Sequence, residues 1–219
     1  MYLRRACSVL AATALATTLV APAALAAPAA HSSTAPTGTR SLAAVLTADG
    51  DTFDHNWYDY DILAQAVLAV LAAKPKSAVG VLTDGTVPLT AFLPNDRAFQ
   101  VLVADLTHRW PRTEEKTFAA LADAVGIDAI EKVLLYHVVP GATIDSTAAL
   151  GSDGARLATA LPGASITVDV ISRRFKLVAL RDNDKNDIDP LLNPRALDIN
   201  KGNKQIAHGI VLVLRPLDL

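Results

Sequence analysis

Most of the information about the fold lies in one stretch, Leu89-Thr90-Ala91-Phe92-Leu93-Pro94-Asn95-Asp96-Arg97-Ala98-Phe99. Residues 90–93 suit a buried strand, and Pro94 ends it because proline cannot donate a hydrogen bond to a ladder. Asn95 or Asp96 can then cap a helix through a side-chain oxygen. The apolar residues that follow recur at helical spacing. The stretch therefore predicts a strand that turns directly into a helix.

Three further helices are expected, because apolar residues recur at helical spacing in three other segments. Acidic residues stand at the start of each segment, where they suit the helix dipole. Gly126 ends the second of these helices and Pro140-Gly141 ends the third. The apolar faces lie within residues 62–71, 118–125 and 130–138.

The second half of the chain carries strand patterns. Apolar and polar residues alternate over 166–170, and 175–179 is expected to pair with this strand across the turn Ser172-Arg173-Arg174. Residues 182–194 are a polar loop. The nearly continuous apolar run 206–214 predicts a last strand that is buried on both faces. Helices first and strands after, without βαβ alternation, indicate an α+β fold with a mostly antiparallel sheet.

The N-terminus reads as a secretory signal peptide over residues 1–26. Arg4-Arg5 forms a basic start, an uncharged apolar run follows, and Ala24-Leu25-Ala26 is an Ala-x-Ala cleavage site. An uncleaved membrane anchor and twin-arginine export are the alternatives. Residues 27–41 are rich in Ala, Pro, Ser and Thr and are expected to be a flexible linker. Residues 42–219 then form a single domain.

Charge and cysteine content exclude several classes of protein. Cleavage after Ala26 removes Arg4 and Arg5 and leaves 18 basic against 22 acidic residues, a net charge of −4. A nucleic-acid partner is therefore not expected. Cys7 is the only cysteine and lies in the signal peptide, so the mature chain has no disulfide or thiol chemistry. We expect an exported protein with no membrane span in the mature chain and no cofactor.

Three segments in order resemble the fasciclin domain family. Residues 90–99 resemble its first signature, and Leu134-Leu135-Tyr136-His137-Val138-Val139-Pro140-Gly141 resembles its central Tyr-His segment. Ile206-Ala207-His208-Gly209-Ile210, followed by 213–216, resembles its closing signature. The likeness runs over residues 59–217. The positions that carry the motif and are expected to be structural are Thr90, Phe92, Pro94, Asn95, Phe99 and His208.

The resemblance implies a wedge-shaped β-sandwich with flanking helices and an extracellular role in adhesion. Two departures stand in the closing signature. Asn203-Lys204-Gln205 replaces the usual Asn-Gly, and Val211 stands where an Asp is common. The chain carries one copy of the domain and no Arg-Gly-Asp tripeptide, so integrin-type adhesion has no local support.

Tyr136 and His137 are the candidate partner-binding residues, since the resemblance links this pair to adhesion. The alternative is structural, because the surrounding Leu-Leu and Val-Val would bury both rings. His208 lies within the apolar last strand and is expected to be a hydrogen-bonded core residue that bridges to another backbone segment, such as the strand 90–94.

Two acidic segments invite other hypotheses. The loop Asp182–Asp189 begins like an EF-hand, but Asp187 replaces the required glycine and Asn193 the final glutamate. A calcium loop of another kind and a solvated turn both stay open. In residues 51–61, acids lie beside aromatic residues, which would suit glycan binding. Alternatively, Trp57 and Tyr60 anchor this segment to the core.

Catalysis has little support in the sequence. It lacks a Gly-x-Ser-x-Gly motif, a cysteine nucleophile in the mature chain, and histidines at zinc-ligand spacing. We therefore expect a secreted, non-catalytic adhesion or surface-interaction module without a metal, whose partner is a protein or glycan on a cell surface or in the extracellular matrix. The alternative is an extracellular protein that binds a small ligand or a glycan.

Overall fold

The computed structural model describes residues 36–48, 50 and 52–217. The predicted signal peptide and most of the predicted linker lie outside these residues. The described residues belong to one compact unit. None of the helices in the described ranges is long and apolar enough to cross a membrane. The helices are α1 Leu42–Leu46, α2 Asp61–Ala73, η1 Ala78–Thr83 (a 3₁₀ helix), α3 Asp96–Thr107, α4 Glu114–Tyr136 and α5 Ser146–Gly151.

The strand-to-helix junction forms as its sequence predicts. Strand β1 covers Leu89–Pro94, and all of its residues are buried. Asn95 caps α3, because its side-chain oxygen accepts a hydrogen bond from the Ala98 N–H at 3.0 Å. Gly126 interrupts α4 with φ +73°, so this helix consists of two segments, as expected from the sequence.

The strands form two sheets of three strands each. One sheet has the order β2-β1-β6 and the other β3-β4-β5. The β1–β6 pair is parallel and the three other pairs are antiparallel, which confirms the mixed α+β class and the mostly antiparallel pairing. The remaining strands are β2 Val138–Pro140, β3 Arg156–Ala158, β4 Ser165–Ser172, β5 Leu177–Arg181 and β6 Gln205–Ile210.

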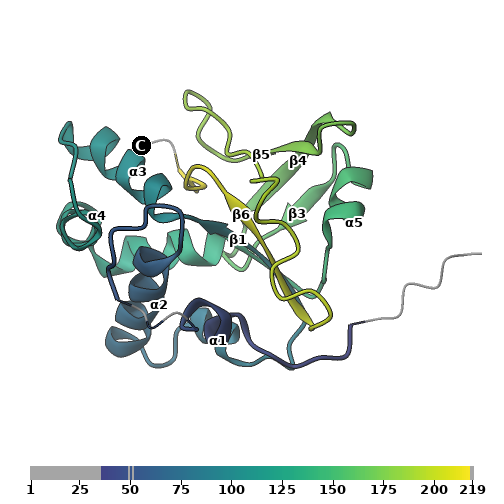
Figure 1. The fold of residues 1–219 in the computed structure, drawn as a ribbon, viewed down its shortest axis with the longest axis horizontal. Helices are drawn as coiled ribbons and strands as arrows, with labels where there is room; N and C mark the ends of the chain where they lie inside the picture. The colour runs from purple at the N-terminus through teal and green to yellow at the C-terminus, as the bar shows by residue number, and fades with distance from the viewer. Residues whose placement is uncertain (1–35, 49, 51, 218–219) are drawn as a thin grey trace, which may run out of the picture. The chain divides into compact units, whose positions relative to one another are not determined.

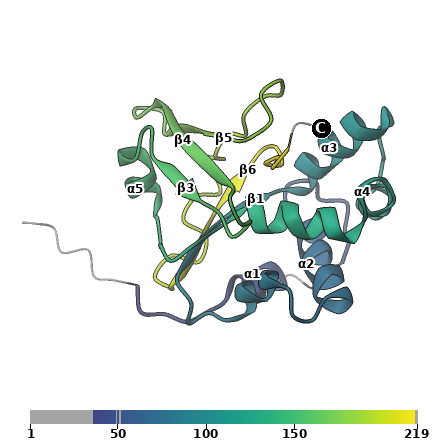
Figure 2. The same cartoon turned by 180° about the vertical axis from the view of Figure 1, so that it is seen from behind.

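The β2-β1-β6 sheet lies between the helices α1 to α4 and the second sheet (Figures 1 and 2). A hydrophobic core lies on each side of it. Leu89, Ala91 and Leu93 face the core built with the helices, whereas Phe92 faces the core shared with the second sheet. Alternate residues of a strand point to opposite faces. Strands β1 and β6 are therefore buried on both sides, as their continuous apolar sequences predict.

Three local predictions were wrong in detail. Val138, expected at the end of a helix, starts β2, because pairing with β1 replaces the last helical turn. Phe175, expected in a strand, lies in the β4–β5 turn and is exposed. The last strand ends at Ile210 instead of residue 214, and Val211 is exposed.

The end of the expected linker is held to the domain. The Gly38 N–H donates to the Gly202 carbonyl at 3.0 Å, and the Arg40 N–H donates to Asn203 Oδ1 at 2.9 Å. The Leu42 N–H donates to Gln205 Oε1 at 2.7 Å. Residues 38–41 are therefore held against the domain, because the segment that leads into β6 offers hydrogen-bond acceptors to their backbone.

Candidate functional site

Tyr136 and His137 are both buried, at 0% and 3% exposure. The Tyr136 hydroxyl donates to the Ser165 carbonyl at 3.1 Å, which links α4 to β4. His137 Nδ1 lies 2.7 Å from the Val133 carbonyl, and His137 Nε2 accepts from the Leu214 N–H at 3.0 Å. This position fits the structural alternative for the pair, since neither side chain reaches the surface.

The partners of His137 fix its tautomer. A carbonyl only accepts, so Nδ1 carries the proton, and Nε2 must be unprotonated to accept from an N–H. Burial lowers the pKa of His137 to about 4. His137 is therefore neutral, and its two hydrogen bonds link the end of α4 to the segment after β6.

His208 is fully buried and holds two loops. Its Nε2 lies 2.9 Å from the Ile144 carbonyl, and its Nδ1 accepts from the Asp198 N–H at 3.3 Å. The ring also lies beside Phe92 of β1, with 6.2 Å between centroids. The imidazole thus bridges to other backbone segments as the sequence predicts, but these are loops around residues 144 and 198, not the backbone of β1.

The other motif residues support the same region. The Thr90 hydroxyl donates to the Ala142 carbonyl and accepts from the Ile144 N–H, so it fixes the loop that follows β2. Phe99 lies in the helical core, and Pro94 ends β1. Together with Asn95, these residues build the junction and are not on the surface.

The Asp182–Asp189 loop surrounds a guanidinium group. Arg215 contacts Asp184 at 3.3 Å, Asp187 at 3.1 Å and Asp105 of α3 at 2.8 Å. The Asp182 carboxylate accepts from the Arg215 N–H at 2.7 Å. Arg215 therefore occupies the position that a cation would take, and this loop is an ion-pair network in the described structure.

A second group of acids, whose members are far apart in the sequence, lies where three helices begin. Asp61, Asp96 and Glu114 are the first residues of α2, α3 and α4, and a carboxylate oxygen from each lies within 4.8 Å of the others. All three are buried. Burial, a side-chain hydrogen bond with Asp59 and the neighbouring Asp59 and Glu114 charges raise the pKa of Asp96 to about 8. We call this group the acidic cluster.

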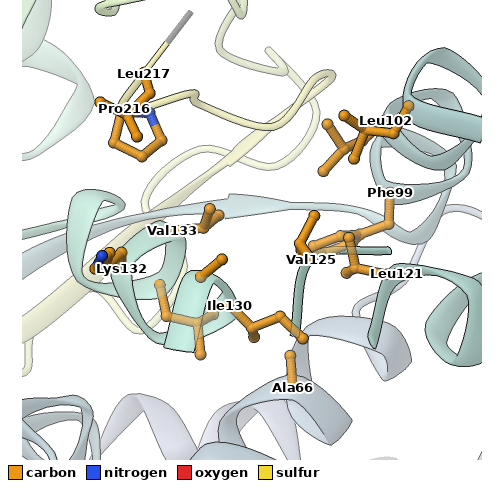
Figure 3. Close-up of a pocket in the computed structure, with 13 residues that line it drawn as sticks. Ala66, Phe99, Leu102, Leu121, Val125, Ile130, Lys132, Val133, Pro216 and Leu217 are labelled. Atoms are coloured by element: carbon orange, nitrogen blue, oxygen red, sulfur yellow. The ribbon is translucent and has the colours of Figure 1, made fainter. Parts of the chain in front are cut away.

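An apolar pocket lies between α2, α3, α4 and the C-terminal segment. Its volume is about 130 Å³, and apolar side chains of the helices point into it, with Pro216 and Leu217 opposite (Figure 3). Among the described residues that line it, Lys132 is the only charged one. The pocket has room for a ring of about the size of benzene. The described lining residues do not provide the convergent polar groups that orient a polar substrate.

The β4–β5 turn exposes apolar and basic side chains together. Ile171 and Phe175 are 59% and 65% exposed. Arg173, Arg174 and Lys176 are also exposed and form no ion pair within the described residues. The guanidinium of Arg174 lies 5.5 Å from the centre of the Phe175 ring. We call residues 171–176 the hairpin tip. The Arg173-Arg174 pair was its only signal in the sequence.

Comparison with known proteins gives two matches of different strength. The Fasciclin domain family model matches residues 64–190. A FAS1 domain pair from the insect cell adhesion molecule fasciclin I aligns with a TM-score of 0.45 and 17% identity, over 66% of this chain and 49% of that chain. The chain thus spans about half of that protein. Among curated proteins, no significant match is found.

Proposed function

Because this chain belongs to the fasciclin domain family, we propose that it is a secreted adhesion module that binds acidic glycans on a cell surface through its hairpin tip. Fasciclin domains are generally adhesion-related, non-catalytic and extracellular or surface-located. The hairpin tip, not the buried Tyr136 and His137, makes the proposed contact. The exposure of Phe175 among three basic residues that form no ion pair with any other described residue is the observation that carries the proposal.

The chemistry of the tip favours an acidic glycan. A guanidinium group binds a carboxylate or sulfate with paired hydrogen bonds, and an aromatic ring stacks on the apolar face of a sugar. The chain as a whole carries a net charge of −2, so the basic tip stands out from the rest of the molecule. Attraction of this kind weakens with salt, because mobile ions screen exposed charges.

Binding of the purified chain to intact cells and to isolated acidic polysaccharides tests this function. We expect saturable binding that Arg174→Glu and Phe175→Ser each weaken by about tenfold or more, as for central contacts of an interface. Lys185→Glu and Ile188→Ser are matched controls, because both residues are exposed on a different loop. Equal loss with the control variants, or binding that disappears when the cells are treated with protease, would contradict the proposal.

Secretion is a separate part of the proposal. The Ala24-Leu25-Ala26 site predicts cleavage after Ala26 and release of residues 27–219. N-terminal sequencing of the protein produced in a bacterial host should find Ala27 first, in the culture medium or the envelope fraction. An intact N-terminus retained in the membrane would show that residues 1–26 are an anchor.

The apolar pocket supports a second candidate function, the binding of a small apolar ligand. Apart from Lys132, the described residues that line it are apolar. A solvatochromic hydrophobic dye should bind it at a single site. Ala129→Leu should displace the dye by filling the pocket, whereas Ala124→Leu, on the same helix outside the pocket lining, should not. Equal dye binding by both variants would exclude this function.

A further inference from the structure

The acidic cluster brings together three residues that are distant in sequence. Asp61, Asp96 and Glu114 each begin a helix, and their exposed fractions are 3%, 0% and 0%. Helix–helix contacts of α2, α3 and α4 hold these starts together. Each helix start contributes about half a positive charge, which favours acidic side chains at these positions.

Hydrogen bonds satisfy part of the cluster. Asp96 Oδ1 accepts from the Ile62 N–H at 2.9 Å, and Glu114 Oε2 accepts from the His55 N–H at 3.0 Å. Glu114 Oε1 is buried and has no hydrogen-bond partner within the described structure. It belongs to a fully buried residue whose carboxylate lies in the cluster. Leaving a carboxylate oxygen buried and unpaired is costly, so such an atom calls for a ligand.

No lysine or arginine of the described residues forms an ion pair with Asp96 or Glu114. This distinguishes the cluster from the Asp182–Asp189 loop, where Arg215 supplies the positive charge. The cluster also extends toward solvent. Asp54, Asp59 and Asp61 form a second group whose carboxylate oxygens lie within 4.8 Å of one another, and Asp54 is exposed. A cation could therefore reach the buried acids along this row.

We propose that the acidic cluster is a Ca²⁺ site, with Asp61, Asp96 and Glu114 as ligands and Asp54 and Asp59 as the outer acids through which the ion enters. Calcium takes six to eight oxygen ligands in flexible geometry and accepts several carboxylates. Magnesium prefers to keep several waters and rarely takes a cage made only of protein groups. Zinc prefers histidine or cysteine, and neither contributes a side chain to the cluster.

The test uses the full chain, freed of metal with a chelator and titrated with Ca²⁺ alone. We expect one site by calorimetry, with a Kd on the order of 10⁻⁴ to 10⁻³ M as for extracellular calcium modules. The melting temperature should rise with Ca²⁺ concentration, because only the folded state holds the site. Absence of both heat and a melting shift at about 10 mM Ca²⁺ would overturn the proposal.

Variants locate the site. Glu114→Gln should weaken Ca²⁺ binding by at least about tenfold, because it removes a charged ligand. Without calcium this variant should be as stable as the wild type or more so, since it relieves repulsion between buried carboxylates. Glu115→Gln is the matched control, because it removes the same charge from an exposed neighbour. Equal Ca²⁺ binding by these two variants would refute the site.

Two further variants show whether a loss of binding is caused by misfolding and whether the calcium binds at another place in the fold. Asp54→Asn changes only an exposed side chain at the outer end and should weaken binding at least about threefold, because ligand charge sets calcium affinity. Asp187→Asn in the Arg215 network should leave binding unchanged. Loss of binding in Asp187→Asn with retention in Asp54→Asn would place the calcium in the Asp182–Asp189 loop and overturn the proposal.

Discussion

Acidification should weaken the fold through His137. The buried ring is held neutral between the Val133 carbonyl and the Leu214 N–H, and its pKa is lowered to about 4. In the unfolded chain the same ring titrates near its ordinary pKa of 6.5. Below pH 6.5 the His137 ring is therefore protonated in the unfolded state but stays unprotonated in the folded state. The stabilising contribution is present above pH 6.5 and is lost as the pH falls toward 4.

The size of this effect follows from the two pKa values. Because protonation and unfolding are coupled, these values imply that the free energy of unfolding falls by about 2 kcal/mol between pH 7 and pH 5 and by about 3 kcal/mol by pH 4. Asp182 acts in the opposite direction, because burial raises its pKa to about 6 and the folded state then takes up a proton first. The pH dependence of stability of the wild type alone therefore does not isolate the effect of His137. A comparison with a variant that lacks the titrating ring is needed.

His137→Gln is the informative variant. Glutamine carries an NH2 donor group and a carbonyl acceptor, so it can bond the Val133 carbonyl and the Leu214 N–H without titrating in this range. Urea unfolding at pH 7 and pH 5 should show that wild type loses about 2 kcal/mol relative to His137→Gln. His108→Asn, at an exposed left-handed helix cap where asparagine is tolerated, is the control. A difference between wild type and His137→Gln that is the same at both pH values would refute the reasoning.

Three other predictions concern stability and are checked by urea unfolding at pH 7. Arg215→Ala should lower the free energy of unfolding by about 3–5 kcal/mol, because it leaves the buried Asp184 carboxylate without its partner. Arg181→Ala breaks an exposed ion pair with Asp169 and should lower the free energy of unfolding by less than about 1 kcal/mol. Asn95→Ala should cost about 1 kcal/mol through loss of the α3 cap, and no loss would show that the cap is not needed. Gly209→Ala should cost about 1–3 kcal/mol, since its Cβ would lie 2.6 Å from the Tyr60 hydroxyl and 2.7 Å from Ala196 Cβ; a neutral result would mean that these loops yield easily.

The sequence is a good guide where the determinants are local. The junction at residues 89–99 is readable because a strand, a proline and a capping residue follow one another in the chain. Gly126 is readable as a helix break for the same reason. The helical prediction for Val138 was wrong because its apolar neighbours suit a helix as well as a strand. Only the pairing with β1 decides between a helix and a strand at this position.

The candidate sites depend on contacts between distant segments, which periodicity does not reveal. Asp61, Asp96 and Glu114 each look like an ordinary helix start, and only the packing of α2, α3 and α4 brings them together. The Asp182–Asp189 loop looks like a metal loop until Arg215 is seen among its carboxylates. Charge counting along the chain cannot say which acids have a cationic neighbour.

The parallel pairing of β1 with β6 has a consequence for how the domain is made. Leu89 pairs with Gln205, so the central sheet joins a strand from the first half of the chain to the last strand of the fold. Pairing over such a separation is slow, because a long loop must close before the contacts form. Both cores use this sheet, so during synthesis the chain stays without its central layer until β6 has left the ribosome.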